Sequence, residues 1–153
     1  MTADLLQGLS QDEAARVLAL GKRVVLTTGA ELFHLGDPAE NIYLVVRGRL
    51  RLTLPMQVRS QDEDVMVEER SAGQTVGWSA LIPPYRFTLT ASAPLETEVI
   101  GLSREALTDY FAAHPDTGYA VSSNLSSIIG QRLQIFQAMW LRGIQTMVEA
   151  RCA

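Results

Sequence analysis

Residues 29–54 read GAELFHLGDPAENIYLVVRGRLRLTL, a segment in which glycines interrupt apolar runs. Gly29, Gly36 and Gly48 separate short runs of aliphatic and aromatic residues, a pattern typical of strands joined by tight turns. In the last run, from Arg49 to Leu54, leucine alternates strictly with arginine or threonine. This period of two predicts a strand with one buried and one solvated face. The stretch therefore predicts several short strands in a row.

The sequence on either side extends this β region over residues 22–102. KRVVLT (22–27) is β-branched, and ETEVIGL (96–102) has the pattern of a last strand. The acid-rich segment 59–70 predicts a solvated hairpin tip followed by an edge strand. A calcium loop is the alternative for that segment, but the segment lacks the ligand order and the glycine bend of an EF-hand. Residues 86–91 alternate polar and apolar side chains, and Arg86 leads the polar face.

Helices are predicted at both ends of the β region. Ser10 and Glu13 have the spacing of a capping box, which predicts a leading helix over residues 9–20. Ser103 can cap a short helix that Pro115 ends, and a long helix follows, so that residues 103–151 are helical.

The long helix carries more apolar surface than one roll needs. Its main stripe steps by three or four residues, the spacing of one helix face: Ile129, Leu133, Phe136, Trp140, Ile144 and Met147. Ile128, Ile135, Met139 and Val148 widen it. We expect this helix to cover the roll and to pair with a second copy, because exposed apolar patches of this size are rare on monomers. The alternative is that the helix only closes its own core.

Composition limits the other partners. The 153 residues are 47% hydrophobic and 20% charged, which fits one domain over residues 1–153. A net charge of −4 disfavours nucleic acid. No apolar run approaches the roughly 18 residues of a membrane span, so we expect a cytoplasmic protein that does not enter a membrane. The single cysteine, Cys152, excludes an internal disulfide.

Two glycine-punctuated motifs suggest a family. Gly29-x-x-Leu32-Phe33-x-x-Gly36 precedes a second motif that runs from Asn41 to Leu50 as NIYLVxxGxL. Together they resemble the cyclic nucleotide-binding domain family, which includes the sensor half of catabolite-activator-type regulators. The resemblance covers nearly the whole chain. It implies an eight-stranded β-roll, or jelly roll, with a leading helix and a long C-terminal helix that often forms the dimer seam.

The resemblance also implies a ligand site. The family's phosphate cassette is matched here by GWSAL (77–81) and by PYRFT (84–88). By position, Arg86 would pair with a cyclic phosphate, and the backbone amides of Ser79 and Ala80 would add donors. The implied ligand-binding residues are Gly77, Trp78, Ser79, Ala80, Arg86, Phe87 and Thr88. The candidate ligand is a cyclic nucleotide such as cAMP or cGMP, or a related anionic small molecule.

Several positions depart from the family pattern. Trp78 replaces the glutamate that accepts hydrogen bonds from the ribose, and tryptophan has no acceptor. Phe87 replaces a small residue, and Phe136 and Gln137 stand where bacterial activators have small hydroxyl residues. The alternative function is therefore a ligand-free dimerisation or protein-interaction module, with an unknown protein partner and a pocket filled by Trp78, Tyr85 and Phe87.

Enzymatic chemistry has little support. A metal-dependent enzyme of the cupin type needs two or three converging imidazoles, and the only histidines are His34 and His114, far apart in sequence. No nucleophile motif is present. We expect no catalytic residue, no metal and no resident cofactor. The chain ends at Ala153, directly after the long helix and without a helix-turn-helix, so a bound ligand is expected to signal through the dimer seam or to a separate partner.

Overall fold

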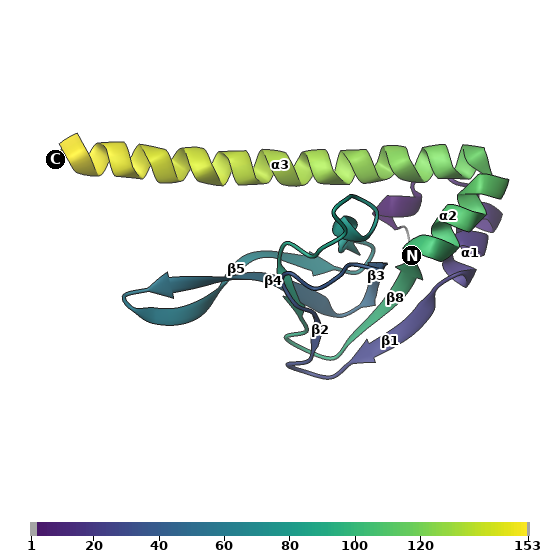
Figure 1. The fold of residues 1–153 in the computed structure, drawn as a ribbon, viewed down its shortest axis with the longest axis horizontal. Coiled ribbons are helices and arrows are strands. Elements are labelled where there is room, and N and C mark those ends of the chain that lie inside the picture. Colours follow the sequence, from purple (N-terminus) through teal and green to yellow (C-terminus); the bar gives the residue numbers. More distant parts are fainter. Residues whose placement is uncertain (1–2, 153) are drawn as a thin grey trace.

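Two antiparallel four-stranded sheets pack face to face in the computed structural model, which describes residues 3–152 (Figure 1). The strands are β1 (Lys22–Leu26), β2 (Glu31–Phe33), β3 (Asn41–Arg47), β4 (Arg49–Val58), β5 (Gln61–Ser71), β6 (Thr75–Val76), β7 (Thr90–Ser92) and β8 (Thr97–Ser103). The sheet orders are β1-β8-β3-β6 and β2-β7-β4-β5. The predicted eight-stranded β-roll is confirmed.

The alternation in β4 has the predicted faces up to the edge of the roll. Leu50 and Leu52 are buried, whereas Arg49 and Arg51 on the other face are exposed. Leu54, predicted to be buried, is 37% exposed. Leu54 is exposed because hairpin β4–β5 extends beyond the roll as a projection, where no second sheet covers it (Figure 1).

The hairpin itself follows the prediction with a shorter tip. Its turn is Arg59 and Ser60, both with positive φ, as a two-residue type I′ turn requires. β5 begins at once and forms one edge of its sheet, so the acids from Asp62 to Asp64 lie on the edge strand and not in the tip. Charges along an exposed edge oppose pairing with another chain.

The turn between β3 and β4 requires a glycine. Gly48 has φ +88°, and a Cβ there would lie 2.6 Å from the Glu96 carbonyl oxygen. Gly36, which lies between β2 and β3, also has a positive φ of +89°, but no atom lies within 4 Å of a Cβ built there, so it isolates the effect of backbone strain. We expect Gly36→Ala to lower the free energy of unfolding by about 1 kcal/mol, from backbone strain alone. Gly48→Ala should cost about 2–3 kcal/mol, because the backbone must also move. Urea unfolding measures both, and equal losses would contradict this account.

The leading and middle helices begin at the predicted caps. α1 (Gln11–Ala19) starts after Ser10, whose Oγ accepts the backbone amide of Glu13 at 3.2 Å. The Glu13 carboxylate does not complete a capping box; it accepts the hydroxyl of Thr117 instead. α2 (Arg104–Ala113) is capped by Ser103 in the same way. A short 3₁₀ helix, η1 (Asp4–Leu6), was not predicted; its Leu5 and Leu6 are buried in the core.

The long helix α3 (Pro115–Cys152) begins at Pro115 and runs past the roll (Figure 1). Its first half packs on the roll through Val121, Leu125, Ile128 and Arg132, which step by four, three and four residues. From Leu133 onward its large apolar side chains are exposed or partly exposed, so the helix covers the roll and leaves apolar surface free, as predicted. Among the described helices, none is long and apolar enough to cross a membrane.

Candidate functional site

The cassette predicted from the resemblance forms a tight turn on the roll. Gly77, with φ +82°, opens the 3₁₀ helix η2 (Trp78–Ala80). Ser79 and Ala80 are buried, and Trp78 is half-buried. The Ala80 amide, predicted to face a ligand, donates to the Gly77 carbonyl at 3.1 Å. That donor is therefore used inside the turn.

Phe87 occupies the space in front of this turn. Its ring stacks on Phe33 with centroids 3.7 Å apart, and a Cβ on Gly77 would lie 3.2 Å from Phe87 Cε1. The cavity left between them is only about 20 Å³. That volume is close to what one water molecule needs.

Arg86 lies outside this cavity. Its side chain is exposed, and Nη1 donates to the Gly36 carbonyl oxygen at 2.9 Å. Arg86 lies before β7, which begins at Thr90. Its backbone forms an isolated antiparallel bridge with Pro38 and is not part of a named strand. Thr88 is also exposed and lines the rim of the cavity. The side chain that points at the cassette turn is the neighbouring Phe87, and the role of Arg86 as a phosphate partner stays a prediction.

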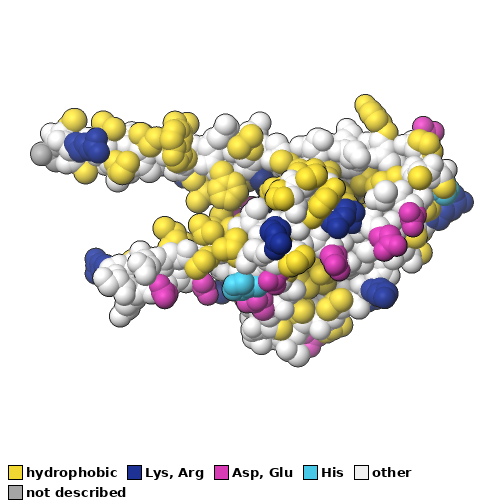
Figure 2. Space-filling view, in the orientation of Figure 1, with side chains coloured by type: hydrophobic (Ala, Val, Ile, Leu, Met, Phe, Trp, Pro, Cys, Tyr) yellow, Lys and Arg dark blue, Asp and Glu magenta, His cyan; other side chains and the backbone are white. Residues whose placement is uncertain are grey.

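A much larger groove lies beside the cassette, between the roll and α3. Its volume is about 540 Å³, within the range of small-molecule sites. It is lined by Leu54, Glu68, Trp78, Thr88, Leu89, Ile129, Arg132, Leu133 and Phe136. We call it the roll–helix groove. Figure 2 shows hydrophobic side chains gathered where the two projections, α3 and hairpin β4–β5, diverge.

A buried ion-pair cluster lies at the groove wall. Arg132 is 6% exposed, its Nη2 donates to the Thr75 carbonyl at 2.8 Å, and its Nε is 3.5 Å from Glu68 Oε1. Arg70 Nη2 donates to Glu68 Oε2 at 2.7 Å. Burial lowers the pKa of Arg132 to about 10, Glu68 opposes that shift and Arg70 adds to it. Glu68 Oε1 and Arg132 Nε are buried with no hydrogen-bond partner in the described residues.

Sequence reasoning did not single out Glu68 and Arg132, although both left a signal. Arg132 continues the roll-facing stripe of Val121, Leu125 and Ile128, so its spacing alone places it inward. Glu68 is paired across the ladder with Leu52, and directly opposed residues share a face. A bulge between Leu52 and Thr53 sets that register, and no sequence motif marks it.

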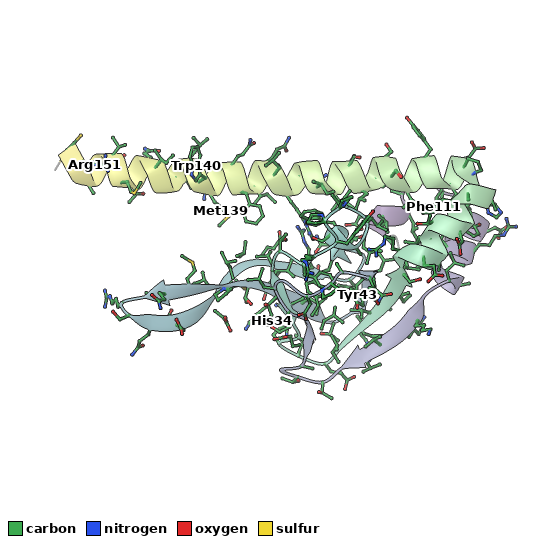
Figure 3. All side chains as sticks on the ribbon, in the orientation of Figure 1. His34, Tyr43, Phe111, Met139, Trp140 and Arg151 are labelled. Atoms are coloured by element: carbon green, nitrogen blue, oxygen red, sulfur yellow. The ribbon has the colours of Figure 1, made fainter. Side chains whose placement is uncertain are left out.

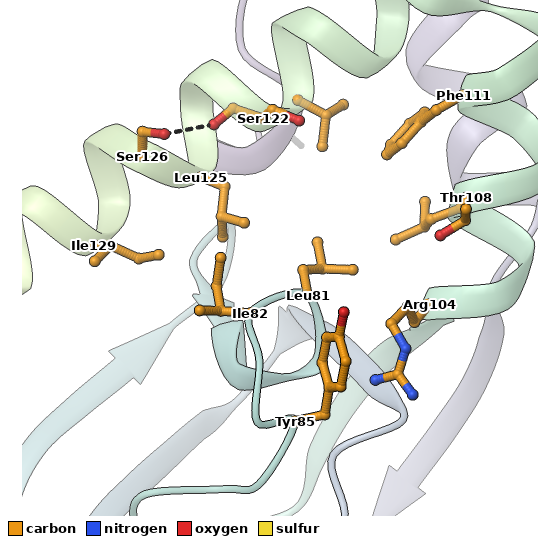
Figure 4. Close-up of a pocket in the computed structure, with 12 residues that line it drawn as sticks. Leu81, Ile82, Tyr85, Arg104, Thr108, Phe111, Ser122, Leu125, Ser126 and Ile129 are labelled. Carbon is orange, nitrogen blue, oxygen red and sulfur yellow. Dashed lines mark hydrogen bonds between the residues drawn. The ribbon is translucent and has the colours of Figure 1, made fainter.

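A second cavity of about 300 Å³ lies between the cassette loop, α2 and α3 (Figure 4). Arg104 borders it and donates through Nη1 to the carbonyls of Ala39 and Ala80, which ties the cassette turn to α2. The Arg104 guanidinium also lies 3.9 Å from the centroid of the Tyr85 ring. The alternative function expected Tyr85 to help fill the cassette pocket. Tyr85 instead lines this second cavity.

The two histidines stay apart. His34 Nδ1 is 3.2 Å from Glu31 Oε1 near the end of β2, and His114 stacks on Tyr110 at the end of α2. In residues 3–152 no group of three or more His, Cys, Asp or Glu side chains is placed to hold a metal ion.

Comparison with known proteins agrees with the fold. The profile of the family described as "Cyclic nucleotide-binding domain" matches residues 23–114, more than half of the chain. Glutaminase 1 of Bradyrhizobium diazoefficiens is 28% identical over 88% of this chain and 21% of its own length. The cyclic AMP receptor protein of Thermus thermophilus is 26% identical over 85% of this chain and 57% of its own.

The same fold is seen in a solved structure. The crystal structure of the Thermus thermophilus catabolite activator protein superposes with a TM-score of 0.76 at 23% identity, over 94% of this chain and 63% of that one. The chain thus spans less than two thirds of these relatives and matches the part of them that contains the roll. With the family profile covering the roll and α2, the chain belongs to the cyclic nucleotide-binding domain family.

Proposed function

We propose that this chain is a regulatory domain that binds its effector in the roll–helix groove and passes the signal along α3. The observation that carries the proposal is the contrast in volume, about 540 Å³ in the groove against about 20 Å³ at the cassette. A ligand the size of a nucleotide does not fit the cassette unless Phe87 leaves its stack on Phe33. The groove needs no such rearrangement.

The position of the groove suits a sensor. Leu54 and Leu89 come from the roll, whereas Leu133 and Phe136 come from α3. An effector bound there touches both bodies, so it can favour one arrangement of the helix over another. This differential contact is what a regulatory domain requires, and it involves no catalytic step.

The exposed half of α3 supports a homodimer as the element that receives the signal. At 100° per residue, the stripe of Leu133, Phe136, Trp140 and Met147 lies about a quarter of a turn from the roll-facing stripe. The helix can therefore pack on its own roll and on a second copy at once. Figure 3 shows Met139 and Trp140 on the part of α3 that runs beyond the roll, where a partner helix could reach them.

Binding of a neutral apolar dye to the roll–helix groove tests this function. N-phenyl-1-naphthylamine should bind with one site per chain and accept energy from the Trp78 indole. Leu89→Glu should abolish its binding, because a carboxylate does not enter an apolar groove without a partner. Ile82→Glu, a change at an exposed position outside the groove, should leave binding unchanged.

cAMP and cGMP complete the same experiment. We expect neither nucleotide at millimolar concentration to displace the dye, in the wild type or in Arg86→Ala, because Arg86 is exposed and lines neither cavity. Displacement that is lost in Arg86→Ala would restore the phosphate anchor implied by the resemblance. Dye binding that survives Leu89→Glu would remove the groove from the proposal.

A further inference from the structure

We propose that the roll–helix groove takes an amphipathic organic anion, with an acyl or aromatic body and one terminal carboxylate that Arg132 binds. This inference rests on the proposed function, since it names the chemical class of that effector. Most of the groove's wall is aliphatic or aromatic, contributed by Leu54, Trp78, Leu89, Leu133 and Phe136. Such a wall favours an apolar body, through the burial of hydrocarbon surface.

The polar end of the ligand follows from what Arg132 lacks. A guanidinium carries five N–H donors, and buried donors are nearly always satisfied in folded proteins. Arg132 Nη2 donates to the Thr75 carbonyl, and Nε is buried facing the Glu68 carboxylate at 3.5 Å. Nη1 makes no hydrogen bond within the described residues and is not among the fully buried atoms, so it is the donor that a ligand can reach. An acceptor brought by a ligand at the groove wall would satisfy this guanidinium, and a carboxylate matches it in charge and in planar geometry.

The charges around the pair are balanced before a ligand binds. Two guanidiniums, Arg70 and Arg132, contact the single carboxylate of Glu68. Asp4 is the other acid close enough to act on Arg132, and it accepts the amide and the hydroxyl of Thr75. Two acids thus offset two guanidiniums, so the choice of a carboxylate rests on the free donor of Arg132 and its planar geometry, not on net positive charge.

Decanoate and decanol form the matched pair of probes. They share the same chain, so the comparison isolates the head group. In an apolar groove without an anchoring cation decanol should bind better, because desolvating a carboxylate is costly. We expect the reverse order here, with decanoate at least about tenfold tighter, the size of a charged hydrogen-bond contribution. Trp78 fluorescence in the Trp140→Phe background reports binding, since these are the only two tryptophans.

The variants assign the preference to Arg132. Arg132→Met should lose the tenfold preference for decanoate and keep its affinity for decanol, and Arg132→Lys should retain part of the preference. Decanol binding as tightly as decanoate to the wild type would overturn the anion and leave the groove as the effector site. No binding of either probe would overturn the groove itself, and with it the proposed function.

The groove could instead be filled by a second copy. Trp140→Glu, which is expected to separate the copies, also leaves Trp78 as the only indole. Equal decanoate affinity in Trp140→Glu and Trp140→Phe supports a groove that is open in the dimer. Probe binding confined to Trp140→Glu would show that partner side chains occupy the groove and would overturn the inference.

Discussion

Phe87→Ala is expected to lower the free energy of unfolding by about 3–5 kcal/mol, the usual cost of deleting a buried phenyl ring. Phe87 is 6% exposed, and its ring fills the space between Phe33 and the Gly77 turn. Removing the ring leaves a cavity that the rigid cassette turn cannot close by collapse. For a chain of this length, the midpoint of thermal unfolding should fall by roughly 10 °C. Urea and thermal unfolding followed by circular dichroism measure both quantities.

Arg86→Ala is the matched control at the adjacent position. Its exposed guanidinium makes one hydrogen bond to a carbonyl, so we expect a change within about 0.5 kcal/mol. The pair of variants tests whether Arg86 or its neighbour Phe87 is the inward side chain. If Arg86→Ala destabilised the protein as much as Phe87→Ala, the arginine and not the phenyl ring would be the inward side chain, and the cassette would have to be reassigned.

The positions of Arg86 and Phe87 show what the sequence could and could not supply. The alternation of Phe87, Leu89 and Ala91 with polar residues was recognised, and it already placed Arg86 on the solvated side. The resemblance then assigned a ligand role to the nearest arginine in the cassette. Along an extended chain a shift of one residue turns a side chain to the opposite face, so a motif match without its register cannot say which residue enters the pocket.

The roll was easier to predict than the groove for a physical reason. Strand alternation and helix spacing are local, and they predicted the buried Leu50 and Leu52 and the exposed half of α3. The pair of Glu68 and Arg132 depends on two elements that meet only in three dimensions and on a bulge that fixes which side of β5 faces inward. Sequence could place Arg132 on the inner stripe, but it could not supply the partner.

Trp140→Glu is expected to raise the dissociation constant of the homodimer at least about 100-fold. Trp140 is 66% exposed in one copy, on the stripe that Leu133, Phe136 and Met147 share. A two-fold seam contains each position twice, so two anchoring rings are lost and two carboxylates face each other. Each large aromatic anchor contributes about 2 kcal/mol, so two anchors contribute about 4 kcal/mol. A 100-fold change in the dissociation constant needs only about 2.7 kcal/mol. Sedimentation equilibrium over a range of concentrations measures the constant.

Ala138→Glu is the control for this variant. It adds the same charge two residues earlier on α3, and at 100° per residue it points to the opposite side of the helix from Trp140. Ala138 is exposed, so the dimer should persist. Dissociation in both variants would mean that added charge alone acts, and dissociation in neither would place the seam elsewhere. Only loss confined to Trp140→Glu assigns the dimer to this stripe, and it would leave the roll-facing side of the same helix free to line the effector groove.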